Sequence, residues 1–369
     1  MTAGQRYSPE PAMICDSRGG AVRKRSTWQR FSAETRHSIN HALFAGGMPQ
    51  ESIALYSRWW QLETYLRSLL YVELRSAYGV DWSNHIGQGA TSRQQMDEAR
   101  KYMATADWED PLSYLDIGKL FPRLEEHWDL VAPSLMDKET FLARKPELLA
   151  IRNRLGHLRR PHEDDLGRLQ QTLRDLEKGA FTAYSSYNTY QQIDRETSDP
   201  VVDAWIHEEH RTAQRLINHA RQQYEVGFNL YHSLRPYAQF PNPGSTITGN
   251  PGSVWVATFN TFARDVDPAA LWRNSYLNKN SRELLIHMLV DYGSVTFTFP
   301  AVDDGSRVAD AIGESFDAVL LSLRSRNDLF DFEVTETPLR DIRLDPRIQI
   351  SSGWNIVDES TVPITIFSA

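Results

Sequence analysis

The feature that most constrains the fold is a run of apolar residues spaced alternately four and three positions apart. The run consists of Leu55, Trp59, Leu62, Leu66 and Leu69. This spacing places the side chains on one side of an α-helix, and that side must pack against other elements. The sequence therefore predicts an amphipathic helix from about residue 51 to Tyr78, with Gly79 as its stop.

The region that follows this helix has further helical patterns. We expect helices over 91–104, 114–131, 138–143 and 147–160. Pro146 is suited to the start of the last of these helices, because proline is common at the first helical position. A last helix after Pro161 is marked by the apolar positions Leu166, Leu169, Leu173 and Leu176. Residues 51–178 are thus predicted to form an all-helical bundle of four or five helices.

The segments on either side of this bundle are less regular. Residues 1–50 hold seven basic and three acidic residues, and they predict a mobile basic arm that becomes helical near 28–43. Residues 179–249 are expected to contain a linker, a long polar helix over 200–234, and a hinge rich in proline and glycine from residue 236 onward.

The C-terminal region mixes strand-like and helix-like patterns. SVWVATFNTF and SVTFTF are rich in β-branched and aromatic residues, as strands are, and IQISS is expected to be a closing strand. SRELLIHMLV and SRVADAIGESFDAVLLSLRSR predict helices. Residues 250–369 are therefore interpreted as an acidic α+β domain. The expected fold class is multidomain, an all-α helical bundle followed by a C-terminal α+β domain.

Length and composition narrow the function classes. A chain of 369 residues exceeds one ordinary domain, and the only cysteine, Cys15, excludes a disulfide framework and a cysteine-based zinc site. No apolar run approaches the ~18 to 20 residues of a membrane span, and the N-terminus lacks the apolar core of a signal peptide. We expect a cytoplasmic protein with no membrane contact.

Charge is distributed unevenly along the chain. The net charge is −8, but residues 301–369 hold 13 acidic and 6 basic residues, whereas residues 144–174 hold 8 basic and 4 acidic residues. Of the 40 basic residues, 33 are arginine, the side chain best suited to bidentate contacts with phosphate. The basic segment is therefore the place where an anionic ligand is expected.

This basic segment contains the strongest chemical motif, Arg152-Asn153-Arg154-Leu155-Gly156-His157. If residues 147–160 are helical, Ile151, Leu155 and Leu158 face the core, while Asn153 and His157 share the opposite face. Gly156 weakens a helix and indicates close approach by another element. The alternative is a solvated polar face that ends in Arg159 and Arg160, two cations suited to a helix C-terminus.

This arginine–histidine motif on a late helix of a bundle resembles the HEPN superfamily (higher eukaryotes and prokaryotes nucleotide-binding) over about residues 51–178. Supporting stretches are LYSRWWQLETYLRSLLYVELRSAYG and YLDIGKLFPRLEEHW. The resemblance implies a metal-independent endoribonuclease without a cofactor, commonly a homodimer whose two motifs face one cleft. Many members are toxins or antiviral-defence effectors. Others are inactive or bind nucleotides.

The residue types fit RNA cleavage through attack by the 2′-hydroxyl. Histidine can move protons near neutral pH, and arginine holds phosphate in two hydrogen bonds. Arg152, Asn153 and His157 are the expected catalytic residues. Arg154, Arg159 and Arg160 are the expected RNA-binding residues. Supporting roles are considered for two more residues, Glu63, which either pairs with Arg67 or holds Arg152, and His162.

Two other functions remain open. One is a non-catalytic RNA- or nucleotide-binding protein, and the other is a scaffold whose basic helix docks a protein partner. Expected partners are RNA, a second copy of the chain through the bundle, and an inhibitory or sensor partner at residues 250–369. The stretch His207-Glu208-Glu209-His210 invites a metal interpretation, but its histidines are three positions apart, and a polar surface helix is favoured.

Overall fold

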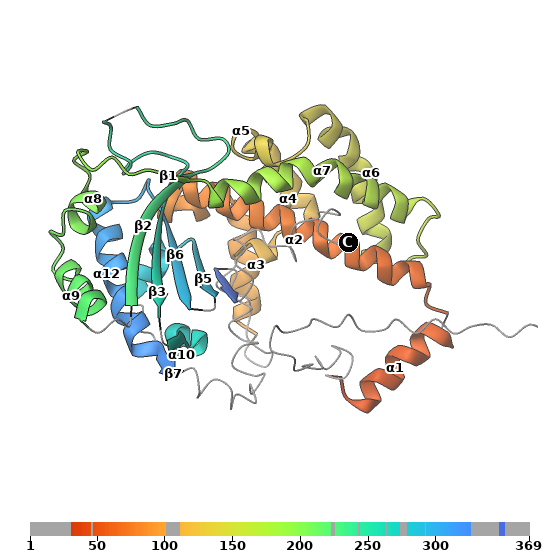
Figure 1. Ribbon diagram of the computed structural model, residues 1–369. Coiled ribbons are helices and arrows are strands. Elements are labelled where there is room, and N and C mark those ends of the chain that lie inside the picture. Colours follow the sequence, from red (N-terminus) through yellow and green to blue (C-terminus); the bar gives the residue numbers. More distant parts are fainter. Residues whose placement is uncertain are drawn as a thin grey trace, which may run out of the picture.

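The structure, a computed structural model, describes residues 31–45, 47–100, 111–222, 226–242, 244–262, 264–273, 279–291, 293–325 and 347–350. Helices come first and a mainly antiparallel sheet follows, which agrees with the expected order of a helical part and an α+β part (Figure 1). The expected mobile arm lies outside the described residues up to residue 30, and so does most of the acidic C-terminal end.

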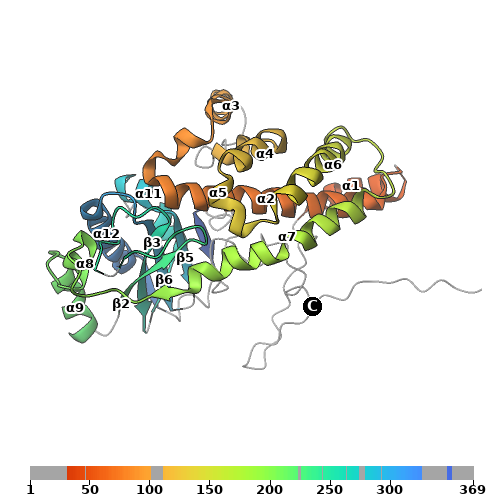
Figure 2. The ribbon, with the colours of Figure 1, turned by 90° about the horizontal axis from the view of Figure 1, so that it is seen from above.

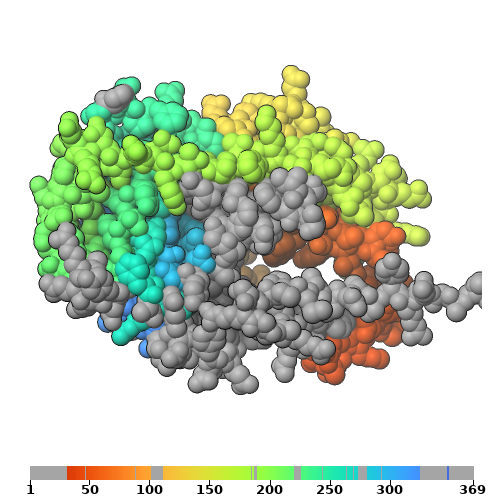
Figure 3. Space-filling model, viewed as in Figure 1, coloured from red at the N-terminus to blue at the C-terminus, as the bar shows by residue number. Residues whose placement is uncertain are grey.

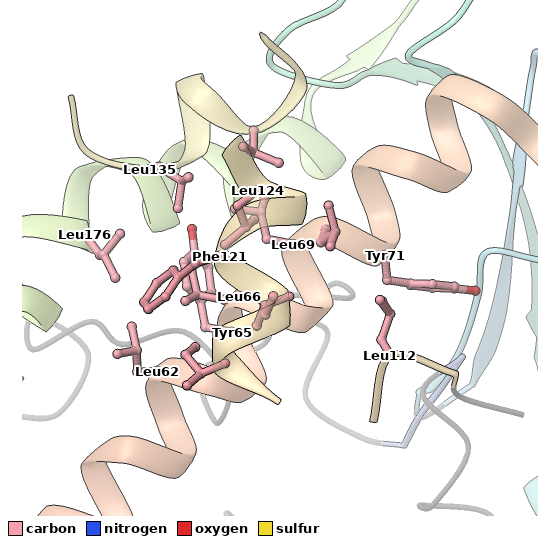
Figure 4. Packing of buried hydrophobic residues seen from close by; sticks show 14 of the residues in the cluster. Leu62, Tyr65, Leu66, Leu69, Tyr71, Leu112, Phe121, Leu124, Leu135 and Leu176 are labelled. Atoms are coloured by element: carbon pink, nitrogen blue, oxygen red, sulfur yellow. The ribbon is translucent and has the colours of Figure 1, made fainter. Parts of the chain in front are cut away.

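The helical half is built around one long helix, α2, against which shorter helices pack (Figure 2). The predicted stripe Leu55, Trp59, Leu62, Leu66 and Leu69 is buried, and Figure 4 shows several of its members against Phe121 and Leu176. The helices are α1 (Ala33–Phe44), α2 (Gln50–Tyr78), α3 (Gln88–Glu98), α4 (Ile117–Glu126), α5 (Trp128–Val131), α6 (Lys138–Gly156) and α7 (Asp165–Asn188).

Helix α2 ends where the sequence predicts. Gly79 has a φ of 55°, a left-handed conformation that glycine adopts without steric cost. A Cβ atom at this position would lie 1.9 Å from Oδ1 of Asp303, which accepts a hydrogen bond from the Val80 N–H at 3.0 Å. Only glycine therefore fits between the end of α2 and the segment that leads into α12 (Gly305–Ser322).

The sheet has the strand order β1-β2-β3-β6-β5-β8, and every neighbouring pair is antiparallel except β5 and β8. The predicted strands at 253–262 and 294–299 are confirmed as β3 and β6, and the one in IQISS as β8. The strands are β1 (Tyr190–Gln191), β2 (Val226–Leu234), β3 (Ser253–Thr261), β5 (His287–Asp291), β6 (Ser294–Pro300) and β8 (Ile348–Ile350). A second small sheet pairs β4 (Arg264–Val266) with β7 (Leu323–Ser325).

Helices cover both faces of the sheet. On one face, α12 packs with α8 (Pro200–Trp205), α9 (Ala213–Gln222) and α10 (Pro268–Arg273) over a core that includes Trp255 and Phe297 (Figure 1). On the other face, Val254, Val256 and Ile286 belong to the same buried cluster as the leucines of α2 and α7. The helical half and the sheet half therefore share a hydrophobic core.

A buried ion pair also joins these halves. Glu73 of α2 and Arg235, just after β2, have fully buried side chains and form two hydrogen bonds of 2.6 and 2.9 Å. Arg235 also donates to Ser186 Oγ on α7 at 2.6 Å. On the same helix, Tyr71 donates to the Ile286 carbonyl, and Arg75 donates to the Glu283 carbonyl.

Several helix boundaries differ from the sequence prediction. Helix α6 is continuous from Lys138 through Pro146, and just before the proline Arg144 and Lys145 pair with Asp175 of α7 and Glu125 of α4. Helix α7 continues to Asn188, through the stretch predicted as a linker. Its buried stripe continues with small residues, Ala180 and Ala183, which lack the leucine signature.

The predicted long helix over 200–234 is wrong. The segment forms α8, α9 and the strand β2. Val226, Phe228, Leu230 and His232 alternate on one face of β2, as in a strand, but they follow directly on the helical pattern of α9. Because β1 and β2 pair into the main sheet, the α+β part begins before residue 250.

The expected hinge is also pinned to its surroundings. Asp199 accepts hydrogen bonds from the N–H groups of Ile247 and Thr248 at 2.9 and 2.7 Å, and the Gly249 N–H donates to the Ala301 carbonyl at 2.7 Å. Proline and glycine prevent regular structure here, yet hydrogen bonds fix the loop. The predicted helix SRELLIHMLV is half wrong, since α11 (Lys279–Leu284) is followed by β5.

Candidate active site

The end of α6 and the turn between α6 and α7, residues 157–164, carry most of the predicted site residues. Helix α6 ends at Gly156, earlier than predicted, and three hydrogen bonds close its end. The N–H groups of His157, Leu158 and Arg159 donate to the carbonyls of Asn153, Leu155 and Arg154 respectively. This is the Schellman arrangement, in which the residue after the C-cap takes a left-handed conformation.

That left-handed position is occupied by Leu158, with a φ of 54°. Glycine usually fills it, because a Cβ atom clashes with the backbone there. Leu158 is 95% exposed, so the prediction that it joins the core stripe is wrong. The physical reason is that the helix ends two residues earlier, and the helical phase no longer applies.

An ion pair between Arg154 and Asp165 fixes the turn on its buried side. Arg154 donates to both carboxylate oxygens of Asp165 at the start of α7, with an Nε–Oδ2 distance of 2.7 Å. The Asp165 side chain is 1% exposed and also accepts from the His162 N–H at 2.9 Å. Burial opposes the charge, yet the hydrogen bonds from Arg154 and the His162 backbone hold the pKa of Asp165 below its usual value.

Arg154 is therefore engaged within the chain, and its role in RNA binding stays a prediction. Hydrogen bonds to Asp165 raise the pKa of Arg154 above its usual value. The sequence analysis missed Asp165 as a positioning residue. The only local signal is an aspartate at the first turn of the next helix, a common place for acidic residues.

The remaining predicted residues of the turn are displayed at its surface. Asn153, His157, Arg159, Arg160 and His162 are exposed. Within the described residues, the side chains of Asn153, His157, Arg159 and Arg160 form no hydrogen bond or ion pair. Their polar groups are thus free to meet a ligand.

Arg152 is half-buried and lies beside the end of its own helix. A Cβ atom built on Gly156 would meet the Arg152 guanidinium at 3.5 to 4.0 Å, which is ordinary contact. The nearest atoms to that position all belong to Arg152, so the described part of this chain brings no other element close to Gly156. The group beside Gly156 is therefore the guanidinium of Arg152, one turn earlier on the same helix.

Glu63 lies on α2, and of its two predicted roles the structure has the pair with Arg67. It pairs with Arg67 at 2.5 Å and accepts a hydrogen bond from Trp59 Nε1 at 2.7 Å. Arg67 also donates to the Leu115 carbonyl at 2.8 Å. Both carboxylate oxygens of Glu63 are engaged on α2, and no described hydrogen bond links Glu63 to Arg152.

The histidines of the 207–210 stretch are also accounted for by local partners. His207 contacts Asp203 and the Arg195 carbonyl, which raise its pKa, and His210 lies 3.1 Å from Asp310. The segment is a loop after α8, so the predicted polar helix is wrong here. No group of three or more metal-ligating side chains occurs among the described residues.

A hollow of about 700 Å³ lies at the opposite end of α6 from the motif. Lys138, Arg144 and Lys178 line it together with Asp137 and Asp175. Since Arg144 is already paired with Asp175 at 3.1 Å, part of this charge is neutralised within the chain. The motif turn itself lies at the surface at the end of the bundle (Figure 3), where a ligand or partner would have to cover it.

Comparisons with protein-family models, curated proteins and solved structures found no match to this chain. Among the described residues, no helix is both long and apolar enough to cross a membrane. The case for a function therefore depends on the residues of the turn and their geometry.

Proposed function

We propose that the chain is a metal-independent endoribonuclease of the HEPN type and that the α6–α7 turn is its active surface. The observation that carries the proposal is the contrast within the turn. Arg154 and Asp165 fix its backbone through buried hydrogen bonds, while His157, Arg159 and Arg160 extend unpaired from it. A rigid turn with free cationic and imidazole groups is suited to a phosphodiester.

In the proposed reaction, the His157 imidazole takes the proton from the RNA 2′-hydroxyl. The 2′-oxygen attacks phosphorus and the bond to the 5′-oxygen breaks, leaving a 2′,3′-cyclic phosphate and a 5′-hydroxyl. The leaving oxygen needs a proton, which His162 or the His157 of a second copy supplies. Arg152 and Asn153 contact the phosphate, and Arg159 and Arg160 bind flanking phosphates.

A homodimer through the bundle is part of this proposal. The turn is exposed, so a single copy does not enclose the reacting phosphate, and two turns facing each other would. Cytoplasmic action as a toxin or antiviral-defence effector, restrained by a partner at the C-terminal region, is the biological role that fits such an enzyme.

A second candidate function is protein docking. The observation in its favour is Leu158, whose large apolar side chain is 95% exposed beside two arginines and would be removed from water by a protein bound over the turn. A third, RNA or nucleotide binding without cleavage, uses the same cations. The experiment below separates all three.

The test is incubation of the purified full chain with total RNA in EDTA, followed by analysis of the cut ends. We expect cleavage that leaves 2′,3′-cyclic phosphates, and a loss of about 100-fold or more in rate for His157→Ala. Arg152→Ala should have a similar effect. His37→Ala, an exposed histidine on α1, is the matched control and should cut normally.

Each other outcome identifies an alternative. Cleavage by His157→Ala at the normal rate would defeat the catalytic assignment, and a requirement for magnesium would indicate a different enzyme. Salt-sensitive RNA binding without cleavage would favour the binding protein. Absence of both would favour docking. Light scattering that shows an active monomer at micromolar concentration would remove the dimer from the mechanism.

A further inference from the structure

A hollow of about 260 Å³ lies at the end of the main sheet, away from the α6–α7 turn. It lies between the chain that follows β1 and the loop that follows β2, both at the β1 edge of the sheet (Figure 1). The polar and aromatic residues that line it include Gln191, Gln192, Asp194, His232, Phe240 and Asn242.

The wall of this hollow is held in place. Asp199, which is fully buried, accepts hydrogen bonds from the Ile247 N–H, the Thr248 N–H and the Thr248 hydroxyl at 2.7 to 3.0 Å. Ile247 is itself one of the lining residues. The loop is thus fixed without a ligand, and a preformed site does not lose affinity by ordering its walls.

One group in the wall of the hollow is almost completely buried. His232 is 5% exposed, and its Nδ1 atom, which is itself buried, has no hydrogen-bond partner within the described residues. Burial lowers the pKa of His232, against the opposing effects of the Gln192 backbone and Asp199. A neutral imidazole offers one donor and one acceptor, and leaving either unmatched in a buried site is costly.

The other side chains have complementary chemistry. The amides of Gln191, Gln192 and Asn242 each carry donors and an acceptor, as the hydrogen-bonding edges of nucleobases require. Phe240 is 73% exposed at the rim, and its ring can stack on a planar base. Asp194 provides a carboxylate of the kind that accepts hydrogen bonds from ribose hydroxyls.

Charge and size limit the ligand further. No lysine or arginine is among the lining residues that the structure describes, and the Asp194 carboxylate would repel a phosphate. The volume is below the ~300 to 1,000 Å³ of sites for drug-sized ligands, so an oligonucleotide does not fit. A single uncharged base with its sugar meets both limits.

We propose that this pocket binds a neutral nucleoside, with the base stacked on Phe240 and its polar edge facing the amides of Gln191, Gln192 and Asn242. Asp194 contacts the ribose. The proposal stands independently of RNA cleavage at the α6–α7 turn, because the two surfaces share no residue.

The test is calorimetric titration of the full chain with adenosine, guanosine, cytidine and uridine, and with their monophosphates. We expect one or more nucleosides to bind, and the corresponding monophosphate to bind at least tenfold more weakly. Phe240→Ala should weaken binding by about tenfold through the lost stacking, and Phe240→Trp should retain it.

Phe262→Ala is the matched control, since Phe262 is an exposed aromatic residue on a loop outside the pocket, and it should bind as the parent chain does. Three results would overturn the proposal. They are no nucleoside binding at millimolar concentration, equal effects of Phe240→Ala and Phe262→Ala, and glucose or a monophosphate binding as tightly as any nucleoside.

Discussion

Two arginine-containing sites in this chain use the same side chain in opposite ways. At the junction between α2 and the sheet, Arg235 is fully buried and donates hydrogen bonds to Glu73, Ser186 and the Ala183 carbonyl. At the α6–α7 turn, Arg159 and Arg160 are exposed and unpaired among the described residues. A buried charge with all its partners supports the fold, whereas exposed charges on a fixed turn are available to a ligand.

Arg154 shows that sequence alone does not distinguish these uses. It sits between Arg152 and the exposed arginines in the same motif, yet it belongs with Arg235, because its partner Asp165 is buried. The difference lies in what the neighbouring helix brings to each position.

The largest expected effect comes from removing the sheet. A chain ending at residue 240 lacks β3, β5 and β6, so β2 loses its main neighbour and Val254, Val256 and Ile286 leave the shared core. We expect an insoluble fragment, measured by the soluble fraction after expression. A soluble fragment with a cooperative unfolding transition would contradict the shared core and would support a separable restraining domain.

The buried ion pair gives the next largest effect. Glu73→Ala leaves the Arg235 guanidinium buried without its carboxylate, and we expect a loss of about 3–5 kcal/mol in unfolding free energy by urea denaturation. Glu126→Ala removes the partner of Arg123 from an exposed i,i+3 pair and should cost at most about 0.5 kcal/mol. The double change Glu73→Leu with Arg235→Met should recover most of the loss, since it leaves neither charge unpaired.

The pH dependence of stability should likewise come from the buried side. Burial lowers the pKa of His287 to about 3, whereas an unfolded histidine titrates near ~6.5. As the pH falls, His287 therefore takes up a proton in the unfolded chain at a higher pH than in the folded chain. The contribution of His287 to the free energy of unfolding is complete at pH values above the pKa of the unfolded chain. It is lost by about 1.4 kcal/mol per pH unit as the pH falls from that pKa toward the pKa of the folded chain.

His287→Gln should flatten this part of the stability curve, measured by urea denaturation at a series of pH values. His157→Gln is the control and should leave the slope unchanged, because His157 is exposed in the turn. An equal change of slope in both variants would mean that the acid sensitivity does not arise from burial of His287.

These tests also mark what the sequence could predict. The stripe of α2 and the strands β3 and β6 follow from local periodicity, because one buried face repeats at a regular interval. The pair formed by Glu73 and Arg235 joins positions 162 apart and leaves no periodic trace. The strand β2 does carry the alternation Val226, Phe228, Leu230, but the adjoining helical pattern of α9 hid it.

The same distinction applies to the site. The sequence located the arginine–histidine motif and its exposure, since polar residues opposite a leucine stripe face away from the core. It did not locate the end of α6, because that end has Leu158 where glycine would announce a Schellman turn. It also missed the hollow lined by His232 and Phe240 at the β1 edge of the sheet, whose walls come from three separate segments.

The smallest expected effect would sharpen the difference between the two sites most directly. Leu158 adopts a left-handed backbone, which costs a non-glycine residue roughly 1–2 kcal/mol, and its exposed side chain recovers little by packing. Leu158→Gly should therefore stabilise the chain by about 0.5–1 kcal/mol in urea denaturation, after allowing for the greater freedom of glycine in the unfolded state. Leu158→Ala keeps the strain and should give no such gain.

If the turn exists to contact RNA or a partner, the more stable glycine variant should bind or cleave RNA less well than the parent chain. A glycine variant that is more stable and fully active would place Leu158 outside the working surface, and one that is less stable would mean that the leucine packs in the turn.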